Sequence, residues 1–363
     1  MAPKIGIIYL TFPTKNWERD IDRAMKSFES LDYPKDRIEL ICVEPKKTSP
    51  RVKDWFDAHW MGKSGTTLPR VHYLFNENEN IGFATNNNIG MEKARELGCD
   101  YVHLTNEDTD VAPDYLTRAV ETAEADPNIG AVQSLILLGE DRDKINSSGN
   151  EFHFLGFGFS RGYTLSREQA PKKVEEIGYA SGAGVLVRVS ALDGLLFDEN
   201  FFSYHEDTDL SLNLRLRGYK IVIDPRSIIW HYYEFAKNKI NYYWMERNRY
   251  ALVFSYYRIW TLFLIFPMLA VMDLAIALFS MRGGWWDMKR KVYGDLFSRD
   301  FWAWIGERRS YLRAVRTIGD RALLKRAVSS IEFQEEAVRN PLLDHVGNPI
   351  MKAYWAIIRL ILV

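Results

Sequence analysis

Two short acidic clusters contain the residues of this chain that are best suited to chemistry. The first spans residues 106–110 and reads Asn-Glu-Asp-Thr-Asp, and the second spans residues 206–209 and reads Glu-Asp-Thr-Asp. Both are expected at turns that follow strands. Two such turns supply oxygen ligands for a divalent cation and a carboxylate that accepts a proton. The two clusters therefore indicate a metal site with a general base.

The second cluster also has a simpler explanation. Glu206 and Asp207 precede leucines at positions 210, 212, 214 and 216, a run that predicts a helix ending near Gly218. Acidic side chains favour helix starts because they face free N–H groups and the positive end of the helix dipole. For this cluster alone, helix capping is the better explanation. The first cluster, at another strand end, shifts the balance toward a chemical role.

Composition limits the kind of protein. The chain has 363 residues, of which 47% are hydrophobic, enough for one large domain with an appendage. A formal net charge of −1 argues against a nucleic-acid binder. Cys42 and Cys99 lie in apolar contexts without metal-ligand spacing, and no signal peptide precedes the first predicted strand. These features predict a reduced, cytosolic protein that binds no nucleic acid.

Buried strands alternate with amphipathic helices along the first two-thirds of the chain. Strands are predicted at residues 5–10, 38–43, 71–75, 101–105, 129–138 and 219–223. This order predicts an α/β fold with a mostly parallel sheet flanked by helices. Ligands of such sheets bind beyond the carboxyl ends of the strands. Thr11, Glu44, residues 76–80 and the first acidic cluster all fall at those ends.

Two further features have both a structural and a functional interpretation. Asn80 and Gly82 belong to an asparagine-rich turn before a helix. Such a turn either presents N–H groups and amides to a phosphate or sugar, or serves only as a turn. His231 follows the last predicted strand. A lone histidine is usually structural, but its position near the acidic edge makes it a candidate metal ligand.

At this point the motifs resemble a known family. They are Asn-Ile-Gly-Phe at 80–83, Asn-Glu-Asp-Thr at 106–109, Ser-Gly-Ala at 181–183, and the segment 197–210 containing the second acidic cluster. Gly218-Tyr219 and His231 complete the pattern over residues 4–235. The chain resembles the family 2 inverting glycosyltransferases, and in particular their rhamnosyl- and galactofuranosyl-transferase-like branch. The resemblance implies the Rossmann-like GT-A fold.

The resemblance also implies roles for residues of the predicted edge. Thr11 and Glu44 correspond to walls of a nucleotide-base pocket, with Glu44 bonding a pyrimidine of a UDP- or dTDP-linked donor. Residues 106–108 correspond to the metal-binding acidic motif of the family, with asparagine in its first place. The implied sets are donor binding by Thr11, Glu44, Asn80, Gly82, Asn106 and Asp108, and Mg²⁺ or Mn²⁺ binding by Asp108, Asp110 and His231.

Catalysis is assigned by the same resemblance. Asp207 takes the place of the catalytic base, and Glu206 lies beside it to orient or bind the acceptor. For the metal, Asp108 is the better ligand, and Asp110 is a second candidate. A departing diphosphate gains negative charge that a divalent cation stabilises, and a single inverting displacement needs a base for the acceptor hydroxyl.

The composition changes after about residue 240. Tyrosines, tryptophans and arginines are followed by a nearly apolar run at 259–281, interrupted by Pro267 and Asp273. Residues 282–326 then carry twelve basic and five acidic residues, a balance of +7. The run is long enough to cross a bilayer, and a shallow or re-entrant insertion is an equal alternative. The apolar end at 351–363 is expected to lie in the same plane.

These patterns predict two regions. Residues 1–238 form a GT-A catalytic domain, and residues 239–363 form a helical region that associates with the cytoplasmic face of the membrane. The alternative for the tail is a helical subdomain that packs on itself or on a second chain, as in a homo-oligomer.

The predicted activity is transfer of a sugar from a nucleotide-sugar donor to a hydroxyl of a glycan acceptor linked to polyprenyl diphosphate. A non-catalytic binding partner in glycan assembly is the alternative. A nucleotidyltransferase is disfavoured because residues 11–17 lack a phosphate loop rich in glycine and lysine.

Overall fold

The computed structural model describes residues 1–12, 15–45, 51–232, 239–331 and 341–362. The chain divides into two compact units. The sheet unit comprises residues 1–150, 160–202 and 219–234. The helical unit comprises residues 151–159, 203–218 and 235–363. The functional division into residues 1–238 and 239–363 stays a prediction.

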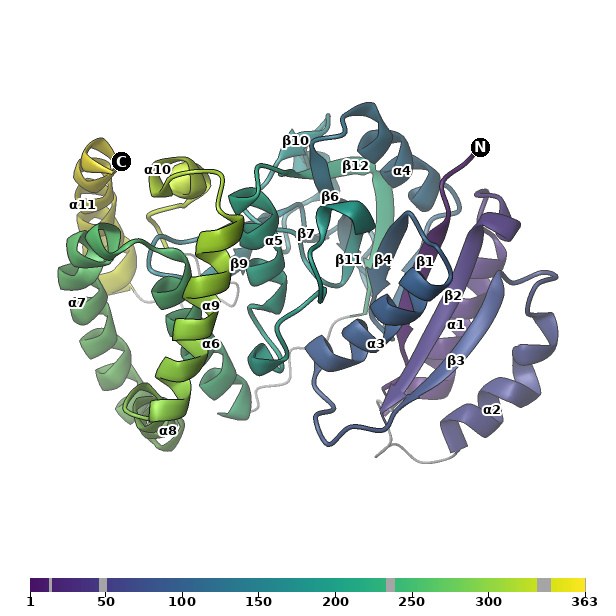
Figure 1. The fold of residues 1–363 in the computed structure, drawn as a ribbon, viewed down its shortest axis with the longest axis horizontal. Coiled ribbons are helices and arrows are strands. Elements are labelled where there is room, and N and C mark those ends of the chain that lie inside the picture. Colours follow the sequence, from purple (N-terminus) through teal and green to yellow (C-terminus); the bar gives the residue numbers. More distant parts are fainter. Residues whose placement is uncertain (13–14, 46–50, 233–238, 332–340, 363) are drawn as a thin grey trace. The chain divides into compact units, whose positions relative to one another are not determined.

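The sheet unit is built on one mixed sheet (Figure 1). Its main strands, in spatial order, are β12, β6, β11, β4, β1, β2 and β3, and all pair in parallel except β11, which is antiparallel to both neighbours. Their bounds are β1 Ile5–Leu10, β2 Ile38–Pro45, β3 Arg70–Asn76, β4 Tyr101–Thr105, β6 Ile129–Leu138, β11 Gly184–Arg188 and β12 Lys220–His231. Short strands at the margins are β5 Thr109–Val111, β7 Ile145–Ser147 and β10 Glu175–Glu176. The predicted α/β class with a mostly parallel sheet is confirmed.

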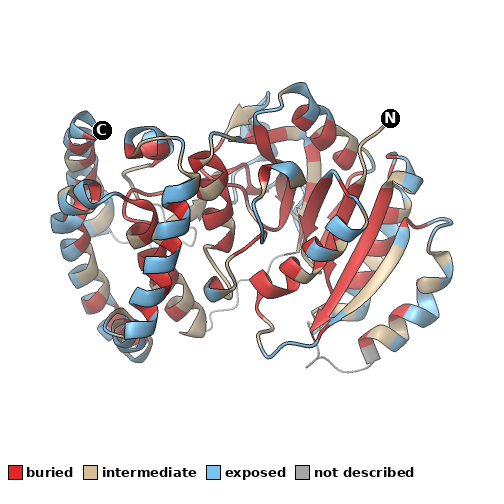
Figure 2. Ribbon diagram, in the orientation of Figure 1, coloured by how far each residue is buried: buried red, intermediate tan, exposed pale blue. Residues whose placement is uncertain are grey.

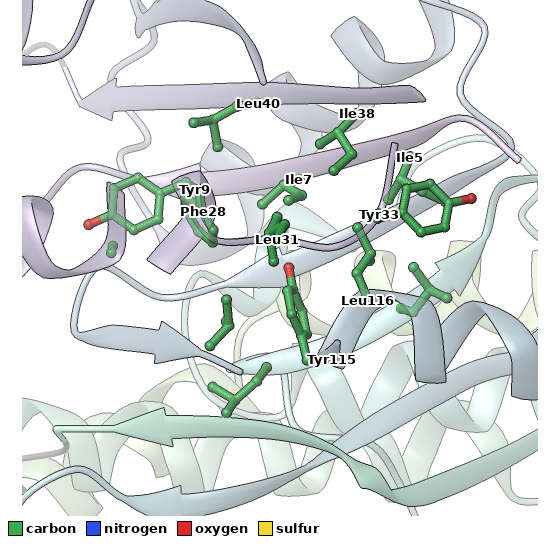
Figure 3. Close-up of a cluster of buried hydrophobic side chains, with 14 of the residues drawn as sticks. Ile5, Ile7, Tyr9, Phe28, Leu31, Tyr33, Ile38, Leu40, Tyr115 and Leu116 are labelled. Atoms are coloured by element: carbon green, nitrogen blue, oxygen red, sulfur yellow. The ribbon is translucent and has the colours of Figure 1, made fainter. Parts of the chain in front are cut away.

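Because the side chains of a strand alternate between the two faces of a sheet, both faces of this sheet need cover, and helices provide it on each. Ile5, Ile7 and Tyr9 of β1 pack in one core with α1 and α4 (Figure 3). On the other face, α3 lies so close that a Cβ on Gly90 would be 2.5 Å from Ile8. The helices are α1 Trp17–Glu29, α2 Arg51–His59, α3 Phe83–Glu96 and α4 Tyr115–Ala125, with short 3₁₀ turns η1 Lys35–Arg37, η2 Met61–Lys63, η3 Arg167–Gln169, η4 Val189–Ala191 and η5 Glu199–Phe201.

The last strand differs from the prediction. A strand ending at residue 223 was expected, but β12 continues to His231 through an irregularity between Asp224 and Ile228. Pro225, which cannot donate to a ladder, is accommodated there. The buried carboxylate of Asp224 accepts a hydrogen bond from Thr122 Oγ1 at 2.7 Å, which fixes this bulge. His231 is therefore the last residue of a paired strand, and the register of β12 sets its position.

The helical unit contains the second acidic cluster and the C-terminal tail (Figure 1). Its helices are α5 Glu206–Leu216, α6 Lys239–Tyr256, α7 Ile259–Gly283, α8 Trp286–Leu296, α9 Arg299–Val315, α10 Asp320–Leu323 and α11 Asn348–Ile361. Shorter elements are the paired strands β8 Asn150–Phe152 and β9 Gly158–Ser160, the turn η6 Leu324–Arg326, and the π-helical turn η8 Leu343–Gly347. The predicted C-terminal helical region is confirmed.

A buried ionic network holds α6, α7 and α8 together. Lys289 Nζ of α8 is fully buried and lies 2.7 Å from both Glu246 Oε2 of α6 and Asp273 Oδ1 of α7. Glu246 also accepts a hydrogen bond from Arg249 Nε at 2.9 Å, and Tyr293 Oη donates to Asp273 Oδ2 at 2.8 Å. Buried charges are tolerated only when they are paired. Asp273, which interrupts the apolar run of the sequence, therefore lies on the packed face of α7.

Candidate functional site

The first acidic cluster and His231 meet in the sheet unit. β5 pairs with the end of β12 so that Thr109 is opposite His231, and Tyr232 N–H donates to Asp108 O at 2.8 Å. This pairing places Asp108 Oδ1 3.0 Å from His231 Nε2. Asp108 follows the carboxyl end of β4, and His231 is the last residue of β12. The structure thus brings Asp108 and His231 into contact, while their role as metal ligands stays a prediction.

The imidazole of His231 is oriented by a second contact. Its Nδ1 lies 3.4 Å from Asn146 Oδ1, and an amide oxygen can only accept a hydrogen bond. Nδ1 therefore donates to Asn146, and Nε2 faces the Asp108 carboxylate at 3.0 Å. A carboxylate oxygen and an imidazole nitrogen held this close are placed to serve as neighbouring ligands of a cation once Nε2 carries no proton.

The residues present fit a divalent cation that shares its shell with a phosphate ligand. Among the described residues, no group of three or more His, Cys, Asp or Glu side chains is arranged to hold a metal. Mg²⁺ in phosphate-transfer sites is held by one or two carboxylates, with phosphates and water as the other ligands. The amide oxygen of Asn106 is buried without a hydrogen-bond partner in the described structure. It is a further candidate ligand, two residues before Asp108 in the sequence.

The charge state of the cluster favours an ionised Asp108. Burial opposes ionisation of this carboxyl, but the adjacent His231 imidazole outweighs burial and lowers the pKa of Asp108. Desolvation and repulsion from Asp108 raise the pKa of the neighbouring, half-buried Glu107 to about 8. Tyr9 Oη donates to the Glu107 carbonyl at 3.0 Å and ties this turn to β1. One negative charge is thus concentrated on the side chain that faces His231.

Asp110 occupies a different environment. In the ladder it is opposite Trp230, so it lies on the face of the sheet away from Thr109 and His231. Its Oδ2 accepts a hydrogen bond from Arg142 Nη2 at 2.9 Å, and Arg23 Nε lies 4.0 Å from Oδ1. The structure therefore does not bring Asp110 to His231, and the geometry favours Asp108 over Asp110 as the metal ligand.

Thr11 and Glu44 lie together at the ends of β1 and β2, as their positions predict. A tyrosine that the sequence did not single out joins them. Tyr73 Oη, from β3, donates to Glu44 Oε2 at 2.5 Å and lies 3.4 Å from Thr11 Oγ1. Burial and the bond to Glu44 raise the pKa of Tyr73, so the phenol stays neutral. In the sequence Tyr73 was only an aromatic within a strand, because its partner depends on the register of β2 and β3.

The asparagine-rich turn is used by the fold itself. Asn80 Oδ1 accepts from Gly82 N at 2.9 Å, and Asn80 Nδ2 donates to Glu199 O at 3.4 Å. Asn86 Nδ2 donates to the carbonyls of Ile81 and Gly82, both at 2.9 Å. These contacts favour the turn interpretation for the side chains, which shape the loop beyond β3.

Position 82 requires a glycine because the backbone of residue 202 lies directly against it. A Cβ at Gly82 would lie 2.6 Å from the carbonyl oxygen of Phe202, whose own φ is 60°. We expect Gly82→Ala to lower the free energy of unfolding by about 1–3 kcal/mol, because an inserted methyl group forces the backbone to move. Gly62→Ala is the control, since nothing lies within 4 Å of its Cβ position. Equal urea midpoints for the two variants would contradict the contact.

The second acidic cluster begins α5 of the helical unit after a strained turn. Tyr204 and His205 have φ values of 66° and 69°, which non-glycine residues rarely adopt. Asn248 Nδ2, from α6, donates to the carbonyls of Ser203 and Tyr204 at 3.0 and 2.8 Å and holds this conformation. Strain of this kind persists only where the surrounding structure enforces it, and it is concentrated at functional sites.

The three carboxylates of this cluster have different environments. Asp209 is buried and accepts hydrogen bonds from Tyr256 Oη at 2.7 Å and from Arg308, so it is structural. Glu206 is buried, and burial together with the nearby Asp207 charge raises its pKa well above the usual value. Asp207 is half-buried and accepts from Thr208 N at 2.7 Å. His205 is the N-cap of α5 without a side-chain cap, and Glu206 and Asp207 lie in the first turn, so the helix-start explanation holds for these two residues beside a chemical role.

Comparison with known proteins gives matches at the level of sequence and of fold. Residues 101–314 match the glycosyl transferase family group 2. Over 202 residues, the chain is 24% identical to glucomannan 4-beta-mannosyltransferase 2 of Arabidopsis thaliana. That alignment covers 53% of this chain and 34% of the plant protein, so the chain spans about a third of the length of this relative.

Two solved structures resemble the chain at low sequence identity. The crystal structure of GalNAc-T7 with UDP, GalNAc and Mn²⁺ has a TM-score of 0.52 and 16% identity, covering 70% of this chain and 50% of that one. The mannosyltransferase PcManGT from Pyrobaculum calidifontis, in complex with GDP-Man and Mn²⁺, has a TM-score of 0.47 and 16% identity, covering 87% and 86%. The first likeness supports the predicted GT-A fold. Because the family match extends over more than half of its residues, the chain belongs to glycosyl transferase family group 2.

Proposed function

We propose that the protein is a metal-dependent inverting glycosyltransferase that moves a sugar from a nucleotide-sugar donor to a hydroxyl of a glycan acceptor. The observation that carries this proposal is the Asp108–His231 pair, in which a carboxylate oxygen and an imidazole nitrogen lie 3.0 Å apart. Family membership supplies the reaction class. GalNAc-T7 was crystallised with UDP, GalNAc and Mn²⁺, which supports a nucleotide-sugar donor and a divalent metal here.

Asp108 and His231 are the proposed metal ligands. A divalent cation bound there stabilises the negative charge that grows on the departing diphosphate. The Asn146 amide keeps the imidazole in the tautomer that presents Nε2, and Tyr9 and Tyr232 fix the backbone on either side of Asp108. Thr11, Glu44 and Tyr73 form the proposed wall for the base of the donor. Asn80, Gly82 and Asn106 shape the loops at the same strand ends.

Asp207 is the proposed catalytic base. A single displacement with inversion requires one group that takes the proton of the acceptor hydroxyl as the new bond forms. Asp207 is half-buried, whereas burial and the charge of Asp207 raise the pKa of Glu206 well above its usual value and favour its protonated form. A protonated Glu206 is a hydrogen-bond donor, so it is suited to binding or orienting an acceptor oxygen.

We propose that the donor is a UDP- or dTDP-linked sugar. We also propose that the protein belongs to the rhamnosyl- and galactofuranosyl-transferase-like branch of the family. Glu44 is the basis for a pyrimidine, because a carboxylate accepts the N–H of a uracil or thymine imide. The test is a thermal-shift screen of UDP-, dTDP- and GDP-linked sugars with Mn²⁺ or Mg²⁺. A ligand that binds only the folded protein raises its melting temperature.

We expect a pyrimidine nucleotide sugar to give the largest shift and to be hydrolysed slowly when the metal is present. GDP-mannose is included because the plant relative is a mannosyltransferase. Binding without any metal-dependent hydrolysis or transfer would favour the alternative, a non-catalytic partner in glycan assembly. No shift with any nucleotide sugar would contradict the proposal.

The helical region is proposed to associate with the cytoplasmic face of a membrane, where a polyprenyl-diphosphate-linked acceptor is available. Among the described residues, α7 alone is long and apolar enough to cross a bilayer. Many residues of α7 and α11 are exposed (Figure 2). The exposed apolar residues of these two helices include Trp260, Phe263, Phe266, Val271, Leu274, Leu278, Ile350, Ile357 and Leu360.

The packing of α7 favours a position in the plane of the membrane surface over a complete crossing. Asp273, near its middle, is bound by Tyr250 of α6 and by Lys289 and Tyr293 of α8. A spanning α7 would draw these polar helices into the hydrocarbon core, at about 2.5–3.5 kcal/mol for each charged residue. A shallow position buries the exposed apolar side chains of α7 and leaves the charged helices at the interface.

The exposed face of α7 predicts a loss of membrane binding in one double variant. Phe263→Glu/Phe266→Glu is expected to weaken partition into lipid vesicles at least about a hundredfold, because burying each phenylalanine contributes about 1.5–3 kcal/mol. Val174→Glu/Leu195→Glu, which changes two exposed apolar residues of the sheet unit, is the matched control. Flotation with vesicles measures both. If the variants floated equally well, packing on a second chain would replace the membrane as the explanation.

A further inference from the structure

A cavity of about 550 Å³ lies within the helical unit, between the end of α6, the start of α7 and α9. Four arginines line it: Arg258 before α7, and Arg309, Arg313 and Arg316 of α9 and its C-terminal end. Ile259 and Trp260, at the first turn of α7, line the same cavity. All these residues lie outside the metal pair and outside the second acidic cluster.

Two of these arginines have a structural role. Arg309 Nη1 donates to Tyr257 O at 2.9 Å and also to Phe254 O, and Arg316 Nη2 donates to Tyr256 O. These are the last carbonyl groups of α6 and the residue after it, and cations near a helix C-terminus are stabilising. Such capping explains Arg309 and Arg316. It does not explain Arg258 and Arg313.

The positive charge of the cavity is only partly compensated. Asp320 is buried and binds Arg316 Nη1 at 2.8 Å, while its other oxygen accepts from Arg258 N–H at 2.7 Å and Thr261 Oγ1 at 2.6 Å. Within the described part of the chain, the side chains of Arg258 and Arg313 pair with no carboxylate. Four arginines against one aspartate leave a charge of +3. Burial, together with repulsion from Arg313 and Arg316, lowers the pKa of Arg309, which is the response expected of an excess of like charges.

The geometry of the cavity suits an anion attached to a hydrophobic chain. Guanidinium groups bind phosphate oxygens through paired N–H donors, and the free N–H groups of a helix start add further donors. The side chains of Ile259 and Trp260 are 69% and 73% exposed beside the arginines. A soluble anion gains nothing from these exposed apolar groups, whereas the chain of a lipid covers them.

We propose that this cavity is a binding site for the phosphate headgroup of a membrane lipid. Arg258 and Arg313 bind the phosphate, and Ile259 and Trp260 contact the first part of the lipid chain. The shared chemistry is a phosphate ester at the bilayer surface, carried either by an anionic phospholipid or by a polyprenyl phosphate. The site rests on the proposed membrane association of α7 and adds headgroup selectivity to it.

Vesicle flotation with the full-length protein tests the site. The vesicles are pure phosphatidylcholine, phosphatidylcholine with phosphatidic acid, and phosphatidylcholine with undecaprenyl phosphate. The variant is Arg313→Glu, and the matched control is Arg290→Glu, since Arg290 is an exposed arginine of α8 outside the cavity. Both reversals change the net charge equally, so the difference between them isolates the cavity from general attraction to a negative surface.

We expect the wild type to bind phosphate-bearing vesicles more tightly than neutral ones, and Arg313→Glu to lose at least about fivefold more of this binding than Arg290→Glu. On pure phosphatidylcholine the two variants are expected to behave alike. A preference for phosphatidic acid identifies a phospholipid, and a preference for undecaprenyl phosphate identifies a polyprenyl lipid. Either result supports the site.

Three results would overturn the lipid site. Equal losses of vesicle binding in both variants would show that the binding comes from general surface charge and not from the cavity. Equal wild-type binding to all three vesicles would remove headgroup selectivity while preserving membrane association. Calorimetric binding of inorganic diphosphate that Arg313→Glu abolishes, and with which the phosphate-bearing vesicles do not compete, would assign the cavity to a soluble anion. Nucleotide-sugar hydrolysis by the same samples keeps the transferase proposal under separate test.

Discussion

Asp207→Asn is expected to lower the turnover number of sugar transfer by about 10²- to 10⁴-fold, the usual contribution of a positioned general base. The substitution keeps the shape of the side chain and removes its ability to take a proton. The affinity for the donor nucleotide is expected to stay nearly unchanged, because the proposed metal ligands are Asp108 and His231. Steady-state kinetics with the best donor of the screen, together with calorimetry of the nucleotide, measures the two effects separately.

Glu206→Gln is the matched control for this loss. Burial and the charge of Asp207 raise the pKa of Glu206 and favour its protonated form, and glutamine preserves the size and the donor capacity of a protonated carboxyl. We therefore expect less than about a tenfold change in turnover, with any larger effect on the KM for the acceptor. A variant Asp207→Asn with near-normal turnover would refute the base. A greater loss in Glu206→Gln than in Asp207→Asn would move the role of the base to Glu206.

The second large effect is expected at the metal pair. Asp108→Asn removes the negative charge that faces His231, and we expect the Mn²⁺-dependent part of nucleotide affinity to fall by about 10- to 100-fold or more. The affinity measured without metal is expected to change little. Calorimetric titration of the donor nucleotide with Mn²⁺, and with a chelator in its place, gives this difference directly.

Asp110→Asn provides the comparison. It makes the same chemical change two residues away, on a side chain that binds Arg142 and faces away from His231. We expect Mn²⁺ to increase the nucleotide affinity of this variant as it does that of the wild type. If Asp110→Asn abolished this increase and Asp108→Asn did not, the ligand would be Asp110 and the pairing of Asp108 with His231 would be structural.

Topology placed Asp108 and His231 at one edge of the sheet, and the family resemblance implied that both bind the metal. Parallel strands end at one edge of a sheet, so the positions of Thr11, Glu44 and Asp108 along the chain were sufficient to place them at that edge. His231 was expected there for the same reason. The path by which it arrives was not foreseen, because Pro225 normally ends a strand and only long-range pairing with β6 and β5 shows that β12 continues past it.

Residues whose roles depend on register were not predictable. Tyr73 meets Glu44 because β2 and β3 pair in one register, and Asn146 meets His231 from a strand of three residues. Neither contact leaves a local pattern in the sequence. Asp273 is a similar case, since an acid within an apolar run gives no indication of Lys289, which follows sixteen residues later and neutralises it.

The most direct test of the central claim is pulsed electron paramagnetic resonance of Mn²⁺ bound to the protein with its nucleotide. Echo-envelope modulation detects an imidazole nitrogen only when it is a ligand of the ion. The account predicts nitrogen modulation in the wild type and in Asp110→Asn, and its loss in His231→Gln. A ternary complex of wild-type protein, Mn²⁺ and nucleotide without nitrogen modulation would contradict the account, because Asp108 and His231 would then not share a cation.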